Sequence, residues 1–178
     1  VPRPYGFFDG VLLMELVCDR DGNVAPRLAE VELTPDDAAA FHRTLIGEVV
    51  RMLCAGLVHG DLSEFNILVD AHGPVIIDLP QAVDAARNNH AKRMLERDVA
   101  NLADYLGQFA PGLLGTDFGN EIWAHYAAGT LTPETPLTGE FAQPTGLADV
   151  EAVLKEIEDV RAEAMRRQEW LAAEQAEQ

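Results

Sequence analysis

The fold is decided by the stretch His59-Gly60-Asp61-Leu62-Ser63-Glu64-Phe65-Asn66, which is followed by two short apolar runs, 67–69 and 75–77, and by Asp78. A turn with Asp and Gly separates the two runs, which predicts a β-hairpin. The hairpin would bring Asn66, at the start of the first run, near Asp78, at the end of the second. Two oxygen-bearing side chains would then face one cleft, with the carboxylate of Asp61 at its mouth.

These three side chains fit the chemistry of phosphoryl transfer from ATP. That reaction needs a carboxylate to orient the attacking hydroxyl, and oxygen ligands for the Mg²⁺ that neutralises charge on the phosphates. Each residue could instead be a turn former: Asp61 capping local amides, Asn66 in an Asx turn, and Asp78 at a strand end. Three turn residues would then have to fall by chance on the spacing that kinase chemistry uses.

The flanking sequence predicts a mainly helical domain with short hairpins, of α+β class. Apolar residues recur at spacings of three and four over residues 35–55, after a capping hydroxyl and a proline. Similar patterns predict a second helix over 91–108 and a shorter one after Asp117. At the other end, residues 5–17 predict two strands joined at Asp9-Gly10, a strong hairpin dipeptide.

The composition is that of a globular protein with an acidic surface. Of 178 residues, 48% are apolar, and 30 Asp and Glu face 13 Lys and Arg, a formal net charge of −17. This excess argues against a broad basic surface for nucleic acid, but it is compatible with a local basic patch. The two cysteines, Cys18 and Cys54, form no disulfide or zinc pattern, and no apolar run is long enough to span a membrane. We therefore expect a cytoplasmic protein.

The central motif resembles that of a known family. Residues 57–68 are similar to the catalytic-loop signature of the RIO family of atypical protein kinases, and residues 76–83 resemble its metal-binding loop. The likeness continues over residues 1–5, 13–15 and 97–101, and it spans roughly residues 1–128. The insert Ser63-Glu64-Phe65 is specific to this family, whereas Gly60 stands where the family more usually has Ala.

The resemblance implies a role for each candidate residue around the nucleotide. Asp61 would be the catalytic aspartate, and Asn66 and Asp78 would be the Mg²⁺ ligands. The residues expected to contact the adenine are Met14 as gatekeeper, Glu15 and Val17 through their backbones, and Leu68 and Ile77 beneath the ring. ATP and Mg²⁺ are therefore the expected cofactors.

Three further residues would support the catalytic loop. We expect the ring of His59 to pack against neighbouring backbone rather than to act as a general base. Asp98 would accept hydrogen bonds from amides of the loop; the alternative is a solvated helix carboxylate. Ser63 stands where ordinary kinases place a phosphate-contacting Lys, and its hydroxyl cannot replace that charge.

The resemblance also divides the chain into four parts. We expect the last strands of an N-terminal lobe and the hinge in residues 1–17, a kinase-like C-terminal lobe in 18–128, a linker in 129–146 and an amphipathic helix in 147–178. The glycine-rich loop and the ATP-anchoring Lys would precede Val1, so that the chain would lack the roof of the ATP cleft and be inactive alone. The exposed hinge or the C-terminal helix could then drive self-association.

The expected function is ATP-dependent phosphorylation of a protein serine, or ATP hydrolysis as a conformational switch. One alternative is a small-molecule phosphotransferase of the aminoglycoside or choline kinase type, which shares the His-Gly-Asp-Leu loop. Those enzymes usually carry His-Pro-Gly where this chain has Ser63-Glu64-Phe65. A second alternative is a non-catalytic, nucleotide-sensing scaffold. The sequence does not identify the protein substrate.

Overall fold

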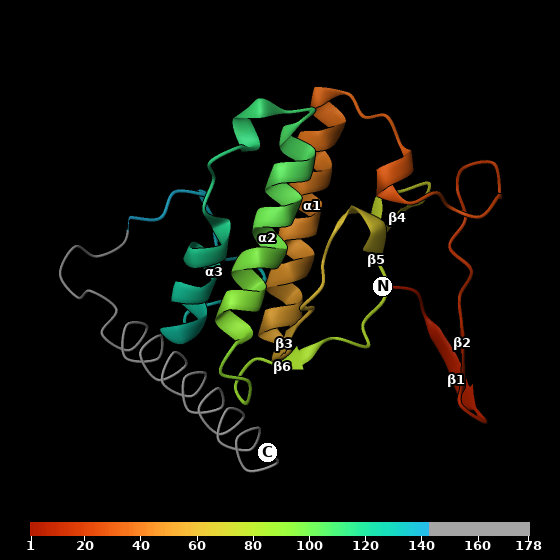
Figure 1. Ribbon diagram of the computed structural model, residues 1–178, viewed down its shortest axis with the longest axis horizontal. Helices are drawn as coiled ribbons and strands as arrows, with labels where there is room; N and C mark the ends of the chain where they lie inside the picture. Colours follow the sequence, from red (N-terminus) through yellow and green to blue (C-terminus); the bar gives the residue numbers. More distant parts are fainter. Residues whose placement is uncertain (143–178) are drawn as a thin grey trace, which may run out of the picture. The chain divides into compact units, whose positions relative to one another are not determined.

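A computed structural model describes residues 1–142 of the chain (Figure 1). The C-terminal helix expected over 147–178 lies outside the described residues. The helices are α1 (Pro35–Cys54), α2 (Ala91–Gly107) and α3 (Phe118–Ala127), and the single-turn 3₁₀ helices are η1 (Leu28–Glu30), η2 (Glu64–Asn66) and η3 (Pro111–Leu113). The strands are β1 (Pro4–Phe8), β2 (Val11–Met14), β3 (Leu57–Val58), β4 (Ile67–Val69), β5 (Pro74–Ile76) and β6 (Val83–Asp84).

The three helices that the apolar spacing predicts are confirmed, with ends that differ by about one residue. Helix α1 begins where expected, because the Thr34 hydroxyl accepts a hydrogen bond from the N–H of Asp37 and Pro35 occupies the first helical position. The helices lie side by side, with α3 on one side of the α1–α2 pair and strands β4 and β5 on the other (Figure 1). The α+β class is confirmed.

The core lies between the helices and the short strands. It is built from the apolar stripes of α1 and α2, from α3, and from one or two side chains of each strand near the catalytic-loop motif. Its largest fully buried side chains are Leu28, Leu45, Leu53, Leu62, Ile67, Ile76, Leu95, Leu102, Leu106 and Ile122. Leu62 and Ile67 belong to the motif itself, so the loop is anchored in the core at two points.

The strands form three two-stranded antiparallel sheets, β1–β2, β3–β6 and β4–β5. The first and third are the hairpins that the sequence predicts. The β3–β6 pair, in which Leu57 faces Asp84, was not predicted, because two-residue strands are too short to show a periodic pattern. This pair matters for the site, since it brackets the segment that runs from the loop to Asp78.

The loop after β2 returns to the β4–β5 hairpin. The N–H of Ala25 donates to the carbonyl of Val17 at 3.0 Å, and the N–H of Val69 donates to the carbonyl of Pro26 at 2.9 Å. Arg27 forms a β-bridge with Leu68. Strand β4 is therefore paired on one side with β5 and on the other with the segment that follows the predicted hinge.

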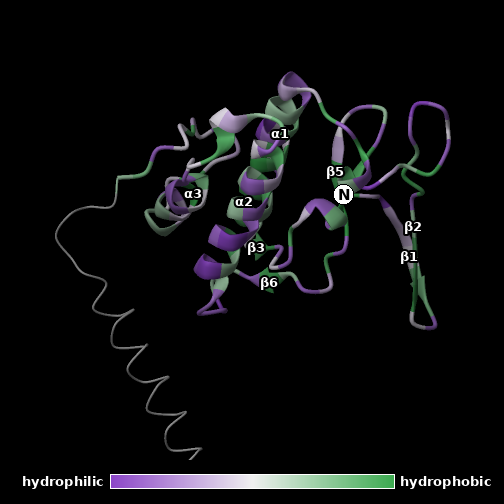
Figure 2. Ribbon diagram, turned by 45° about the horizontal axis from the view of Figure 1, so that its top comes forward, coloured by the Kyte–Doolittle hydropathy of each residue, from purple (hydrophilic) through white to green (hydrophobic). Residues whose placement is uncertain are grey.

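The β1–β2 hairpin carries apolar side chains that are exposed to solvent. The side chain of Phe7 is 69% exposed and that of Met14 is 45% exposed. Figure 2 shows hydrophobic residues along β2 and at the end of β1. Strand β2, which we expect to belong to the hinge, is thus exposed within residues 1–142.

The segment expected to be a linker, residues 129–146, is attached to α3 in its first part. The carboxylate of Glu121 accepts hydrogen bonds from the N–H groups of Thr138, at 2.9 and 3.0 Å, and of Gly139, at 2.7 Å. The compact unit accordingly extends to Phe141. None of the helices within residues 1–142 is both long and apolar enough to cross a membrane.

Candidate active site

Helix α2 holds the loop that carries Asp61. The carboxylate of Asp98 is 1% exposed and accepts hydrogen bonds from the N–H groups of Gly60, at 2.7 Å, and Leu62, at 3.2 Å. Burial raises the pKa of the Asp98 carboxyl, and the two backbone donors, His59 and Arg97 offset part of that effect. The side chain of Asp98 therefore faces the loop amides rather than solvent.

Two neighbours of Asp98 on the helix bind the carbonyl groups of the same loop residues. A guanidinium nitrogen of Arg97 donates to the carbonyl of Gly60, and the amide of Asn101 donates to the carbonyl of Leu62 at 3.1 Å. The backbone is thus held on both sides of Asp61. Because the exposed Asp61 side chain lies between these two anchored residues, its position is set by the helix.

The buried ring of His59 connects two backbone segments of the site. Its ring is 3% exposed, and Nε2 lies 3.0 Å from the carbonyl oxygen of Ile77, which can only accept a hydrogen bond. Nε2 therefore carries a proton, and Nδ1 accepts the N–H of Asp61 at 3.3 Å. In this arrangement the imidazole links the catalytic loop to the residue before Asp78.

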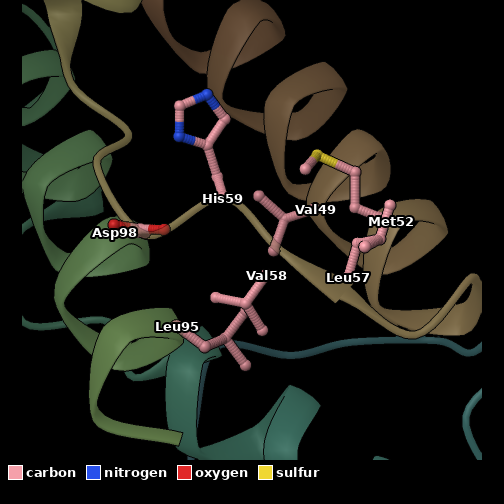
Figure 3. A pocket seen from close by; sticks show the side chains of 7 residues that line it. All are labelled: Val49, Met52, Leu57, Val58, His59, Leu95 and Asp98. Atoms are coloured by element: carbon pink, nitrogen blue, oxygen red, sulfur yellow. The ribbon is translucent and has the colours of Figure 1, made fainter. Parts of the chain in front are cut away.

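A small cavity of about 10 Å³ lies beside His59 and Asp98 (Figure 3). Its other lining side chains are apolar and come from α1, β3 and α2. A volume of this size is at the lower limit for one water molecule, so the cavity cannot hold a substrate. It is a packing defect beside the loop, and not a substrate site.

The side chains of Asp61 and Asn66 are in contact. The Asn66 amide donates to the carbonyl of Asp61 at 2.7 Å and lies 3.4 Å from its carboxylate oxygen Oδ2. The amide of Gln81 lies at the same distance from Oδ2. Neither Oδ1 of Asp61 nor Oδ1 of Asn66 has a hydrogen-bond partner among residues 1–142.

Asp78 lies two residues after the end of β5, the strand that pairs with β4. The N–H of Ile77 donates to the carbonyl of Asn66 at 3.0 Å, so Asp78 is one residue beyond a paired position. Its φ of 67° lies in the left-handed region, where Asp is better tolerated than bulky residues. The backbone turns away from β5 at this point, and the exposed carboxylate accepts no hydrogen bond from the described part of the chain.

The oxygen donors on this loop and strand fit a magnesium ion. No group of three or more His, Cys, Asp or Glu residues within 1–142 could enclose a metal ion. Mg²⁺ does not need such a cage, since it is usually held by one or two carboxylates together with waters and substrate phosphates. The free oxygen of Asn66 and the carboxylate of Asp78 are such a partial set.

The residues expected around the adenine are placed in two groups. Leu68 and Ile77 lie on or next to the β4–β5 pair, close to Asn66 and Asp78. Met14, Glu15 and Val17 lie at the end of β2 and in the loop after it. Among the described residues, no hydrogen bond joins the second group to the catalytic loop; the link between them runs through the loop that pairs with β4.

Sequence reasoning missed Gln81, and it did not assign loop contacts to Arg97 and Asn101. All three act on residues that are 20 or more positions away, so no local pattern identifies them. The spacing of Asp98 and Asn101 places both on one face of α2, which was the available signal. Ser63, a predicted supporting residue, precedes η2 and accepts the N–H of Asn66 through its carbonyl, while its hydroxyl forms no capping bond.

The comparisons with known proteins agree on one family. A family model of the RIO domain matches residues 1–116. The chain is 42% identical over 106 residues to the RIO-type serine/threonine-protein kinase Rio1 of Haloferax volcanii, a match that covers 59% of this chain and 35% of the relative. It is 38% identical over 105 residues to the Rio1 kinase of Thermoplasma acidophilum, covering 58% of this chain and 52% of the relative.

A human relative shows the same pattern. The chain is 37% identical over 105 residues to the human serine/threonine-protein kinase RIO1, covering 58% of this chain and 18% of the relative. The match thus spans about half of these relatives or less. Since the family model matches well over half of this chain, the chain belongs to the RIO domain family.

Proposed function

We propose that the protein transfers the γ-phosphoryl group of Mg-ATP to a serine or threonine hydroxyl of a protein, as the names of its relatives suggest. The observation that carries this proposal is the site geometry. An exposed carboxylate, Asp61, stands on a loop clamped by α2, and two oxygen donors, Asn66 and Asp78, stand on paired backbone segments beside it.

Asp61 would orient the acceptor hydroxyl. Its two long contacts, to Asn66 and Gln81, both involve Oδ2, which leaves Oδ1 available to accept the hydroxyl proton. As the bond from the hydroxyl oxygen to the γ-phosphorus forms, the bond to the β-phosphate oxygen breaks, ADP leaves, and the proton passes to Asp61. The clamp fixes the carboxylate in advance, so little reorganisation is needed in the transition state.

Asn66 and Asp78 would hold the magnesium ion. When bound, the ion neutralises the negative charge that builds up on the phosphate oxygens. The contribution of the protein is to keep both side chains free of competing hydrogen bonds at their ligating oxygens. The carboxylate of Asp78 supports this role, because it is exposed and accepts no hydrogen bond from residues 1–142.

The nucleotide base would bind against the segment after β2. The N–H of Glu15 donates to the carbonyl of Arg3, and the carbonyl of Val17 accepts the N–H of Ala25. The carbonyl of Glu15 and the N–H of Val17 have no hydrogen-bond partner among residues 1–142, which leaves one acceptor and one donor for the edge of the adenine. Met14 would lie beside the base as the gatekeeper, and Leu68 with Ile77 would support the ring from below.

The helix-dominated fold supports a further part of the proposal. Residues 18–128 would form the kinase-like C-terminal lobe, which supplies the catalytic carboxylate, the metal ligands and the lower face of the nucleotide site, and residues 1–17 would form the hinge. The roof of the cleft would come from a part of the enzyme outside the described residues.

The test is an assay of the natural full-length protein with γ-labelled ATP and a serine-containing protein acceptor. Asp61→Asn should lower the transfer rate by about 10²- to 10⁴-fold, the range for loss of a general base, with the Kd for ATP changed less than about twofold. Asp104→Asn, an exposed carboxylate on α2, is the matched control and should retain activity. Label recovered only as inorganic phosphate would reject protein phosphorylation in favour of ATP hydrolysis, and normal turnover by Asp61→Asn would reject the role of Asp61.

A further inference from the structure

The start of α2 carries a basic hollow beside the candidate active site. We use this name for the surface depression of about 420 Å³ that is lined by His90, Arg93, Met94 and Arg97. Four of the 13 Lys and Arg residues of the chain fall within residues 87–97, although the formal net charge of the whole chain is −17. A local concentration of positive charge on such an acidic protein needs a separate explanation.

The basic hollow directly adjoins the loop that carries Asp61. The methyl carbon of Met94 lies 2.5 Å from the point where a Cβ on Gly60 would be, and Arg97 donates to the carbonyl of Gly60. Two of the four lining residues therefore contact the residue next to Asp61. A peptide whose hydroxyl is at Asp61 would therefore lie close to the hollow.

One cation in the hollow is available for a ligand. Neighbouring charges are already engaged, since Arg87 pairs with Asp84 and Lys92 pairs with Glu96, each at 3.7 Å. Arg97 is bound to the loop carbonyl and lies 3.8 Å from Asp98. Arg93 is exposed and forms no ion pair or side-chain hydrogen bond with any residue in 1–142. Its guanidinium can therefore bind an incoming anion through two parallel hydrogen bonds.

Other features of the hollow favour the same kind of ligand. His90 is the residue that precedes the first turn of α2, where the helix dipole places partial positive charge. The acidic surface elsewhere repels extended polyanions such as nucleic acid, which would have to contact more than this one site. A single carboxylate or phosphate on a peptide has no such requirement.

We propose that the basic hollow recognises an anionic side chain of the protein substrate, within a few residues of the acceptor hydroxyl. The ligand would be the carboxylate of Asp or Glu, or a phosphorylated residue, and Arg93 would be its main contact. This inference rests on the proposed function, because it assigns a substrate preference to the same site. It makes Arg93 a specificity-determining residue rather than a catalytic one.

Fluorescence anisotropy with the 178-residue chain tests the recognition without requiring catalysis. Three labelled peptides share one central serine in a neutral background; one adds three Asp residues beside the serine, one adds a phosphoserine, and one stays neutral. We expect the acidic or the phosphorylated peptide to bind at least 10-fold more tightly than the neutral one at low salt. Comparison of the two anionic peptides distinguishes carboxylate from phosphate recognition.

Arg93→Glu should abolish this difference. Arg43→Glu makes the same change of charge at an exposed position on α1. In this control, the ratio of affinities for the anionic and neutral peptides should stay within about twofold of that of the unmodified chain. Equal binding of all three peptides, or equal weakening by both variants, would overturn the inference.

A phosphorylation assay with the natural full-length protein separates this inference from the proposed function. Preferential transfer to the anionic peptides that is lost in Arg93→Glu would support both. Arg93-dependent binding without any transfer would support the inference while rejecting the proposed function. Transfer to all three serine peptides at equal rates would overturn the inference and leave the proposed function in place.

Discussion

The carboxylate of Asp98 accepts the N–H of Gly60 at 2.7 Å, although the two residues are 38 positions apart. This bond joins a helix that is anchored in the core to the loop that carries Asp61. Leu95 and Leu102, each 1% exposed, fix the same helix on either side of Asp98. The buried side chain of Asp98 therefore links the packing of the core to the position of the candidate catalytic aspartate.

Replacing Asp98 should destabilise the fold and loosen the loop. Asp98→Asn keeps the size of the side chain but offers one acceptor oxygen to two buried N–H groups, so one donor faces an NH₂ group. We expect a loss of about 1–3 kcal/mol in the free energy of unfolding, measured by urea denaturation. The control Asp104→Asn, at an exposed site on the same helix, should change stability by less than about 0.5 kcal/mol. Equal effects of the two variants would show that Asp98 is not an anchor.

Replacing Asp78 should affect the metal complex of the nucleotide more than the nucleotide itself. Asp78→Ala removes a carboxylate that, in our proposal, contacts only the ion. In the natural full-length protein, we expect the Kd of Mg-ATP to rise by at least 10-fold, while the Kd measured with excess chelator changes less than about threefold. Titration calorimetry with and without Mg²⁺ makes this comparison. Equal weakening under both conditions would contradict the assignment of Asp78 as a ligand.

The elements that the sequence predicted well are those with long or specific local patterns. Helices α1 and α2 have stripes of apolar residues over several turns, and the Asp9-Gly10 turn marks the first hairpin. The hairpin that the sequence predicted after Asn66 is present, and its ends meet where Ile77 donates to the carbonyl of Asn66. The catalytic and metal-binding roles of Asp61, Asn66 and Asp78 stay predictions.

The features that the sequence did not predict depend on contacts between distant segments. Strands β3 and β6 have two residues each and are stabilised by their surroundings rather than by their own pattern. Gln81 reaches Asp61, and Asn101 reaches Leu62, through side-chain amides whose direction depends on the tertiary fold. The basic hollow was not predicted either: helical spacing places its four residues on one face of α2, but only the packing of α2 against the loop puts that face beside Asp61.

His42 should make the stability of the fold depend on pH. Its ring is 3% exposed and packs on the ring of Phe118, with 5.3 Å between the ring centroids. Among the described residues, its Nε2 is the one fully buried side-chain polar atom without a hydrogen-bond partner. Burial lowers the pKa of His42 below 6.5, so the unfolded chain takes up a proton first as the pH falls. The free energy of unfolding therefore keeps the full contribution of the neutral ring above pH 6.5, and it loses this contribution progressively as the pH falls below 6.5.

Urea denaturation at a series of pH values between 7.5 and 5 tests this prediction. We expect the free energy of unfolding to fall more steeply with acidification in the unmodified chain than in His42→Leu, which has no titrating ring. His72→Leu, at an exposed position, is the control and should follow the unmodified chain. Parallel curves for the unmodified chain and His42→Leu would show that this ring does not carry the pH dependence.

Replacing Gly60 by Ala should lower the free energy of unfolding by more than the strain of its backbone conformation alone. Its φ is +82°, where a side chain adds strain, and a Cβ would lie 2.5 Å from the methyl of Met94 and 3.0 Å from the carbonyl oxygen of Gln81. Gly56 has nearly the same φ, +80°, with no atom within 4 Å of a Cβ. Gly56→Ala therefore measures the strain alone, about 1 kcal/mol. We expect Gly60→Ala to lose about 1–2 kcal/mol more by urea denaturation, because the Gln81 carbonyl belongs to the backbone and has to shift. Equal losses in the two variants would mean that the loop adjusts freely around Asp61, and that the close approach at Gly60 does not restrain the site.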